Sequence, residues 1–222
     1  MLTIEKTVLP SPAQWEIMIE GMRNPKNSWD KSDSYATHIE DPETLETADF
    51  AYFVGDNDLD LMTRLAKGGP VHAKYRRMIP VFLTINAPFY WWKEFDTYKV
   101  GTVCNSCSTM HKIHDKEFTL DDFSHEDLFG FSKEILCTTI EALNDARSAY
   151  LLTNDRRWWH AMIQMLPTSY NQKRTIMLNY EVLFNIFHSR RNHKLSEWHI
   201  LRDWIRTLPL SELITMEDNT DA

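Results

Sequence analysis

Residues 87–114 read APFYWWKEFDTYKVGTVCNSCSTMHKIH, and this is the stretch of the chain that decides the fold. It combines aromatic bulk with lysines, a Glu and an Asp, an Asn-Ser-Cys-Ser sequence and histidines. A polar group that is buried without a hydrogen-bond partner costs free energy, so a purely structural segment rarely carries so many of them. A ligand pocket accommodates such a mixture, and we therefore expect these residues to line one.

The composition of the whole chain indicates one globular domain in the cytoplasm. Its 222 residues are 43% hydrophobic, which is enough to bury a single core. The formal net charge of -8 predicts no general attraction to nucleic acid or to anionic membranes. Three cysteines, an odd number, and the lack of a signal-peptide pattern favour a reducing compartment. No apolar stretch approaches the roughly 20 residues of a membrane span, so we expect a soluble protein with no membrane or nucleic-acid partner.

The hydrophobic pattern outside residues 87–114 predicts both strands and helices. Short apolar runs at 2–8 and 78–85 predict strands, and Ser11 followed by Pro12 is typical of a helix start. Helical patterns are expected over residues 40–67, 124–152, 155–165, 174–191 and 195–208. The fourth of these is apolar on nearly every side, which predicts a central, buried helix.

Two arginines, Arg190 and Arg191, close the helix that we expect to be buried. Each lies four residues after an apolar residue of that helix, so at least one guanidinium is carried toward the buried side. A guanidinium cannot lose its charge, and its burial therefore requires an anion. That anion is either a bound ligand or a carboxylate of the protein itself, and a surface position beside the helix dipole is a further alternative.

Cys104 and Cys107, followed by His111 and His114, have the residue types of a zinc site. On one helix these positions form a single stripe, and ligands in a row cannot surround one ion tetrahedrally. A loop would allow that arrangement. A Cys-x-x-Cys redox pair is the other alternative, although nothing nearby resembles a thioredoxin-like βαβ unit. We expect no metal.

Several short motifs follow one another over roughly residues 68–204. In the first half, Ala87-Pro88 ends an expected strand, an aromatic segment covers 91–95, and NSCSTM occupies 105–110. In the second half come Leu166-Pro167, Asn179 and Asn185 in the expected buried helix, the Arg pair at its end, and SEWHI at 196–200.

This order of motifs resembles that of the flavin-dependent thymidylate synthases. In that family a strand ending in Ala-Pro leads through an aromatic helix to Arg-His-Arg and then to Asn-Glu-x-Ser-x-Arg. Family identities are kept at Asn105, Ser108, Asn179, Asn185 and Trp198. The Arg that ends the family's buried helix and contacts the nucleotide base matches Arg190 or Arg191, depending on the direction of counting.

The sequence also departs from the family pattern. The Arg-His-Arg triplet falls at 97–99, which read Thr-Tyr-Lys and leave a single cation. Ser106 replaces the motif Glu, Met110 replaces its phosphate-binding Arg, and Glu94 stands where the family has Gln. The Arg ahead of Leu-Pro is matched by Ile163 or Gln164. Most of the bidentate phosphate donors are therefore missing.

The resemblance implies an α+β fold in a single domain over 1–222, with a small mixed sheet, long helices and a frayed tail at 217–222. It implies a homotetrameric enzyme that methylates, or otherwise modifies, a pyrimidine deoxynucleotide such as dUMP. FAD would be the cofactor, with NADPH and methylenetetrahydrofolate as co-substrates. By resemblance the catalytic residues are Arg190 and Arg191. Glu94, Lys99, Ser106 and Ser108 would bind the substrate, and the flavin would contact Tyr98, Lys99, Asn105, Asn179 and Asn185.

Two alternatives remain open. One is a divergent homologue that carries out a different base modification, with Tyr98 or Cys104 as proton donor or nucleophile. The other is a non-catalytic nucleotide-binding or regulatory protein, which the loss of cationic ligands favours.

Overall fold

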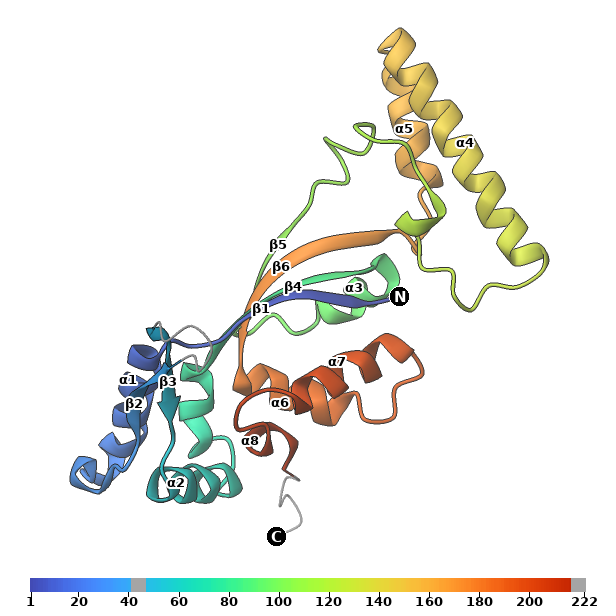
Figure 1. Ribbon diagram of the computed structural model, residues 1–222. Helices are drawn as coiled ribbons and strands as arrows, with labels where there is room; N and C mark the ends of the chain where they lie inside the picture. The colour runs from blue at the N-terminus through green and yellow to red at the C-terminus, as the bar shows by residue number, and fades with distance from the viewer. Residues whose placement is uncertain (41–46, 217–222) are drawn as a thin grey trace. The chain divides into compact units, whose positions relative to one another are not determined.

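The computed structural model describes residues 1–40 and 47–216. The chain forms two compact units, each assembled from separate parts of the sequence (Figure 1). The first unit comprises Met1–Lys6, Leu83–Thr97 and Cys104–Ile176, and the second comprises Thr7–Phe82, Tyr98–Val103 and Met177–Ala222. The fold is α+β, as predicted. A single domain over 1–222 stays a prediction.

The first unit contains most of a four-stranded sheet, whose strand order is β1-β4-β6-β5. The strands are β1 (Thr3–Val8), β4 (Pro80–Pro88), β5 (Val103–Ser106) and β6 (Asn171–Asn179). The helices of this unit are α3 (Phe89–Phe95), the short 3-10 helix η4 (Leu120–Asp122), α4 (Phe131–Thr153) and α5 (Arg156–Met165). The strands expected at 2–8 and 78–85 and the helix expected at 155–165 are therefore confirmed.

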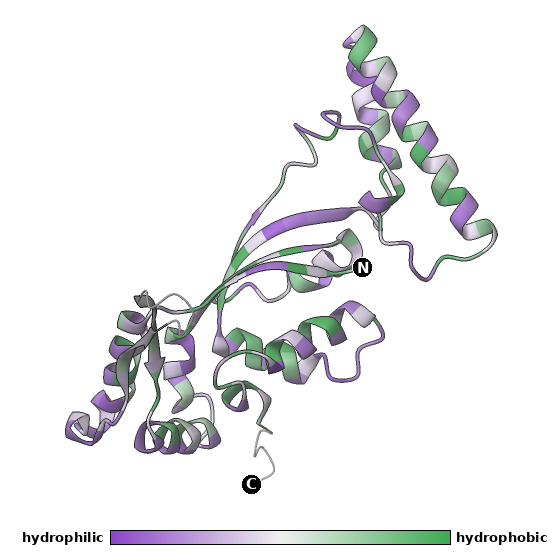
Figure 2. Ribbon diagram, in the orientation of Figure 1, coloured by the Kyte–Doolittle hydropathy of each residue, from purple (hydrophilic) through white to green (hydrophobic). Residues whose placement is uncertain are grey.

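Helices α4 and α5 pack together around a hydrophobic cluster in the first unit. Figure 2 shows hydrophobic and hydrophilic residues alternating along α4, as in an amphipathic helix. The buried members of the cluster are Ile113, Phe118, Phe123, Leu136, Ile140, Leu143, Ala146 and Met162. Asn144 of α4 fastens the preceding segment, because its side chain accepts a bond from the Phe118 N–H (2.8 Å) and donates one to the Phe118 carbonyl (2.9 Å).

The second unit is mainly helical. Its elements are α1 (Pro12–Arg23), the 3-10 helices η1 (Asn24–Lys26) and η2 (Trp29–Lys31), β2 (Tyr35–Glu40), β3 (Thr47–Phe53), α2 (Asp56–Lys67), η3 (3-10, Ala73–Met78), α6 (Tyr180–Ser189), α7 (Ser196–Arg206) and α8 (Glu212–Thr215). Strands β2 and β3 pair antiparallel. Helix α1 begins as predicted, with Ser11 as N-cap and a capping box to Gln14.

Helix α6 lies in the core of the second unit. Six of its residues are buried: Tyr180, Val182, Leu183, Phe184, Ile186 and Phe187. Arg76 of η3 is 2% exposed and anchors this helix. Its Nε donates to Glu181 (2.9 Å), its Nη1 donates to the Leu213 carbonyl (3.1 Å), and its guanidinium lies 3.9 Å from the centre of the Phe184 ring.

Three predicted helices are wrong in their first parts. The helix expected over 124–152 begins only at Phe131. Residues 171–179 form strand β6, so the helix expected over 174–191 begins only at Tyr180. Residues 47–53 form strand β3, so the helix expected over 40–67 begins only at Asp56. At the β6–α6 junction apolar residues continue from the strand into the helix, which hides the boundary. At the β3–α2 junction Gly55 and Asp56 mark the helix start, but the apolar positions before them were interpreted as helical rather than as a strand. Residues 41–46 of the second prediction, and the tail expected to fray at 217–222, lie outside the described residues.

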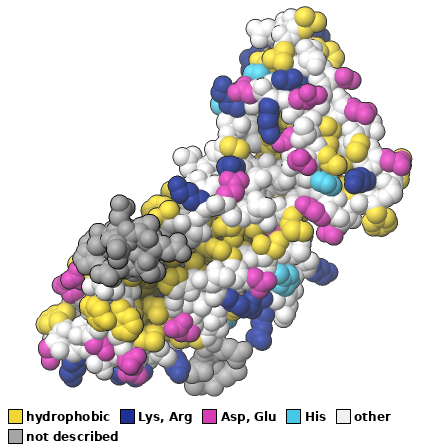
Figure 3. All heavy atoms as spheres, viewed as in Figure 1, with side chains coloured by type: hydrophobic (Ala, Val, Ile, Leu, Met, Phe, Trp, Pro, Cys, Tyr) yellow, Lys and Arg dark blue, Asp and Glu magenta, His cyan; other side chains and the backbone are white. Residues whose placement is uncertain are grey.

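No helix in the described ranges is both long and apolar enough to cross a bilayer. On the face drawn in Figure 3, basic and acidic side chains are interspersed over the α4–α5 region. That face therefore presents a mixed surface rather than a continuous basic one, in keeping with the net charge of -8.

Candidate functional site

Arg190 and Tyr98, which lie far apart in the sequence, meet in the second unit. Arg190 follows the last residue of α6, and its backbone N–H donates to the Ile186 carbonyl (3.0 Å). Its Nε donates to the Tyr98 hydroxyl (2.9 Å), and its guanidinium lies 4.5 Å from the centre of the Trp198 ring. Arg190 is half-buried. The permanent charge is thus held against two aromatic side chains, an arrangement that can receive an anionic group.

Arg191, the other candidate catalytic residue, is exposed. Its carbonyl accepts a bond from Arg202 Nη1 (3.2 Å), while Arg202 Nε donates to the Phe187 carbonyl (3.0 Å). Arg202 therefore satisfies backbone oxygens at the end of α6, where a helix leaves carbonyls without internal partners. Burial, followed by the nearby positive charges of Arg206 and Arg191, lowers the pKa of Arg202. Arg190 is thus the more buried of the two arginines, and which of them faces a ligand stays a prediction.

The loop that carries Tyr98 and Lys99 packs on the start of α6. Asn179 is the N-cap of that helix, and its side-chain oxygen accepts a bond from the Val182 N–H (3.1 Å). Gly101 has a φ of +80°, and a Cβ placed there would lie only 3.0 Å from Asn179 Nδ2. A glycine is therefore required at this close approach. Lys99 is exposed.

The other predicted contacts are distributed over both units. Asn185 belongs to α6 in the second unit and is exposed. Asn105, Ser106 and Ser108 belong to β5 and the turn after it, in the first unit, and all three are exposed. The Ser108 hydroxyl accepts a bond from the His111 N–H (3.0 Å). Glu94 of α3, also in the first unit, is half-buried. The structure thus brings Tyr98, Asn179 and Arg190 into one unit, and the roles assigned to all these residues stay predictions.

A second arginine site, absent from the sequence-based prediction, lies in the first unit at Arg174 of β6. Its Nη1 donates to Asp96 (2.8 Å), and its Nε donates to Gln172 (2.8 Å). The guanidinium lies 4.4 Å from the centre of the Trp92 ring, and Nη1 is 3.9 Å from Cys104 Sγ. The sequence carries no signal for it, because residues 171–179 read as a polar run followed by an apolar run rather than as an alternating strand pattern.

Gln172 connects β6 to the turn that holds Cys107, just after β5. Its side-chain amide donates to the Cys107 carbonyl (3.0 Å), and the Cys107 N–H donates to the Lys173 carbonyl (2.9 Å). Cys104 and Cys107 are exposed free thiols. Within the described ranges no three His, Cys, Asp or Glu side chains lie close enough together to hold a metal ion.

The sequence matches no protein-family model and no curated protein. Solved structures nevertheless share its fold. One is the flavin-dependent thymidylate synthase ThyX from Helicobacter pylori complexed with FAD and dUMP, with a TM-score of 0.60, 14% identity and 97% of each chain covered. Another structure of that enzyme with FAD and dUMP gives a TM-score of 0.62 at 15% identity, covering 97% of this chain and 96% of that chain.

A third similar structure is the UMP/dUMP methylase PolB from Streptomyces cacaoi bound with 5-Br dUMP. Its TM-score is 0.59 at 10% identity, and the match covers 96% of this chain and 93% of that chain. The protein therefore has the fold of the flavin-dependent thymidylate synthases, and the resemblance predicted from the sequence is confirmed at the level of the fold. A fold by itself does not settle an activity.

Proposed function

We propose that this protein is a nucleotide-modifying enzyme that acts on a pyrimidine deoxynucleotide such as dUMP. The supporting observation is the half-buried Arg190 guanidinium, which is bonded to the Tyr98 hydroxyl and lies against the Trp198 ring. It occupies the end of the helix where, by resemblance, the family contacts the nucleotide base. All three similar structures were solved with dUMP or 5-Br dUMP.

In this proposal Arg190 binds and orients the nucleotide. Its planar guanidinium offers several N–H donors in a fixed geometry, and the bond to Tyr98 together with the contact to Trp198 restricts its rotation. Lys99, exposed on the loop next to Tyr98, adds a second positive charge. Glu94, Ser106, Ser108 and Arg191 complete the proposed substrate-binding and catalytic set.

The proposed cofactor is FAD, and the chemistry of the donor set fits it. Asn105, Asn179 and Asn185 carry amide N–H donors that suit the carbonyl oxygens of a flavin ring, while Tyr98 offers an aromatic face and Lys99 a positive charge. Asn179 uses its side-chain oxygen to cap α6, which leaves its amide nitrogen as the donor. A bound flavin would supply hydride-transfer chemistry, with NADPH and methylenetetrahydrofolate as the proposed co-substrates.

Two measurements test the proposal: the flavin absorbance retained after incubation with FAD, and the change in melting temperature caused by dUMP. Purified protein incubated with FAD should retain flavin absorbance after gel filtration, and dUMP should raise its melting temperature, because a ligand of the native state stabilises it. Arg190→Ala should lose most of the dUMP effect. Arg190→Lys, which keeps the charge but not the planar donor set, should retain part of it.

The matched control is Arg157→Ala, which removes an exposed arginine whose charge is paired with Asp155. It should respond to dUMP as the unaltered protein does. Failure of dUMP to stabilise the unaltered protein, or equal responses of the Arg190 and Arg157 variants, would contradict the nucleotide proposal. Stabilisation by dUMP without flavin retention or turnover would instead support a non-catalytic nucleotide-binding protein.

A different base modification is the second candidate function. The observation that favours it is the exposed Cys104 thiol, whose Sγ lies 3.9 Å from Arg174 Nη1, so that a candidate nucleophile and a cationic side chain are adjacent. Cys104→Ser and Tyr98→Phe should then each reduce the measured activity. If both variants keep it unchanged, this candidate fails.

The assembly and location of the protein are also proposals. By the same resemblance we infer a homotetramer, which light scattering coupled to gel filtration would detect as four times the 26.2 kDa chain mass. We place the protein in the cytoplasm, and fractionation of the producing cells tests that assignment.

A further inference from the structure

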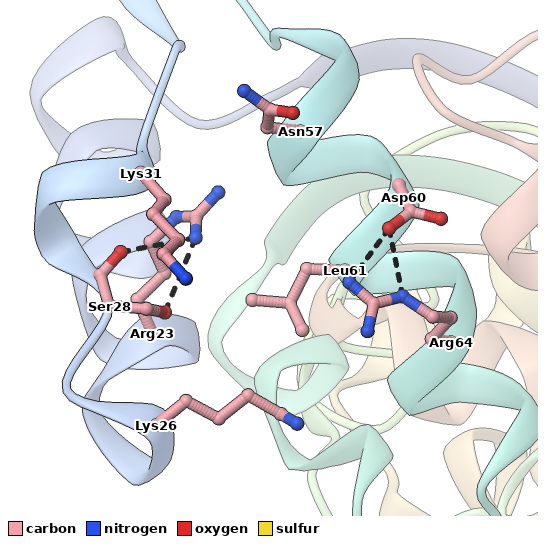
Figure 4. Close-up of a pocket in the computed structure, with 8 residues that line it drawn as sticks. All are labelled: Arg23, Lys26, Ser28, Lys31, Asn57, Asp60, Leu61 and Arg64. Atoms are coloured by element: carbon pink, nitrogen blue, oxygen red, sulfur yellow. Dashed lines mark hydrogen bonds and ion pairs between the residues drawn. The ribbon is translucent and has the colours of Figure 1, made fainter.

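A cavity of about 600 Å³ in the second unit lies between the end of α1, the 3-10 helices after it, and α2 (Figure 4). We call it the α1–α2 cavity. Its lining includes four cationic side chains, Arg23, Lys26, Lys31 and Arg64. None of the residues assigned above to the nucleotide or the flavin lines it.

Arg23, the last residue of α1, is only 3% exposed. Its Nε donates to Asp58 (2.5 Å), and its Nη1 donates to both the carbonyl (3.1 Å) and the hydroxyl (3.3 Å) of Ser28. Its Nη2 is buried and has no hydrogen-bond partner among the described residues. Figure 4 shows that this nitrogen points away from Ser28, toward the side of the cavity where Asn57 lies.

A buried donor of a charged group that lacks a partner is costly, and native proteins rarely retain one without a reason. The pairing with Asp58 accounts for Nε only. Nη2 needs a further acceptor, and an acceptor carried by a ligand in the cavity would supply it.

The charge of the lining also favours an anion. Asp60 is the single acid among the lining residues, and it is engaged by Arg64 through bonds of 2.7 and 2.8 Å (Figure 4). Asp58, which does not line the cavity, neutralises the positive charge of Arg23. Among the described residues Lys26 and Lys31 then remain as excess positive charge at the cavity, in a protein whose formal net charge is -8.

We propose that the α1–α2 cavity binds a phosphate-bearing small molecule, whose anionic oxygens are met by Arg23 Nη2, Lys26 and Lys31. Charge-assisted bonds of this kind are the ones with which arginine and lysine recognise phosphate. The volume lies within the range of pockets for small molecules and cofactors. This site is additional to the proposed nucleotide site at Arg190.

Pyrophosphate is the probe that tests the proposal. Its binding to the purified protein is measured by calorimetry and by the shift in melting temperature, against sodium chloride at equal ionic strength. The test variant is Lys26→Ala/Lys31→Ala, which removes two exposed charges and leaves the Arg23–Asp58 pair intact. The matched control, Lys6→Ala/Lys133→Ala, removes two exposed lysines that do not line the cavity.

We expect pyrophosphate to bind the unaltered protein and the control equally, and the test variant at least about 10-fold more weakly. Arg64→Gln, a second variant at the rim, should weaken binding by a smaller factor. Equal binding to test and control variants, or no binding to the unaltered protein, overturns the proposal.

To distinguish the two proposed sites, the variant of each site is tested with the probe for the other site. Arg190→Ala should keep its response to pyrophosphate, and the Lys26/Lys31 variant should keep its response to dUMP. If Arg190→Ala abolishes the response to pyrophosphate, the anion binds at Arg190 and the α1–α2 cavity is not its site. Because the Lys26/Lys31 variant is read against its own melting temperature without ligand, a general loss of stability cannot imitate the expected result.

Discussion

Arg23 and Arg76 are two buried arginines of the same unit, 3% and 2% exposed, with different surroundings. Arg76 is held by a carboxylate, a backbone carbonyl and an aromatic face, all supplied by α6 and α8. Arg23 also has a carboxylate and a carbonyl, but one of its nitrogens is left without a partner beside a cavity. Burial alone therefore does not reveal the role of an arginine. The inventory of its donors separates a structural residue from one that is prepared for a ligand.

The largest expected effect comes from removing the carboxylate beside Arg23. Asp58 is fully buried and accepts bonds from Arg23, from the Ser32 hydroxyl and from the N–H and hydroxyl groups of Ser34. Asp58→Ala leaves a buried cation and several donors unpaired, so we expect a loss of about 3–5 kcal/mol in the free energy of unfolding. Urea denaturation measures it, and a loss below about 1 kcal/mol would contradict this account.

A smaller loss is expected at Arg76. Glu181→Ala removes its carboxylate, but Arg76 keeps the Leu213 carbonyl and the Phe184 ring, and Glu181 is itself 12% exposed. We expect about 2–3 kcal/mol by the same urea measurement. If this variant is less stable than Asp58→Ala, then Arg76 depends on its carboxylate more than Arg23 does, and the comparison is reversed.

The contribution of the Arg23–Asp58 pair to the free energy of unfolding should depend on pH. Burial raises the pKa of Asp58, but hydrogen bonds from Ser34, Ser32 and Arg23 outweigh it, so the pKa lies below its usual value of 3.8. A carboxyl group with a lowered folded-state pKa stabilises the protein above its unfolded-state pKa, and this contribution is lost as pH falls through the folded-state value. The stability difference between the unaltered protein and Asp58→Ala should therefore be constant near neutrality and shrink below about pH 4. Urea curves collected across that range check it, and a difference independent of pH would contradict it.

The smallest effect is expected at the rim of the α1–α2 cavity. The Asp60–Arg64 pair is exposed and spans one helical turn, so Arg64→Gln should change the free energy of unfolding by about 0.5 kcal/mol or less. The same substitution is expected to weaken pyrophosphate binding. A large stability loss would show that Arg64 is structural and would remove it from the proposed site.

The sequence predicted elements best where their ends carry local signals. Ser11 and Pro12 mark the start of α1, and Asp155 caps α5, where its side chain accepts a bond from the Arg157 N–H. The boundary between β6 and α6 was missed although Asn179 caps α6. Asn179 was interpreted by resemblance as a cofactor ligand, while its capping bond is a local role that the residue type also indicates.

The candidate sites were harder to predict, because their partners are distant in the sequence. The helical pattern and the resemblance both led to the pair Arg190 and Arg191, and the structure supplied the contacts of Arg190 with Tyr98 and Trp198. Neither Arg174 nor Arg23 was identified. The bond from Arg174 to Asp96 and that from Arg23 to Asp58 join different secondary-structure elements, and no periodicity within one segment encodes such pairs.

The tight approach at Gly101 has a consequence for engineering the protein. Any side chain at this position would have to adopt a positive φ and press against the amide that caps α6. A mutant library intended to alter substrate range should therefore leave Gly101 untouched and diversify its exposed neighbours, Thr97 and Lys99. Variants from such a library would change side chains near the proposed site without straining the backbone at Gly101.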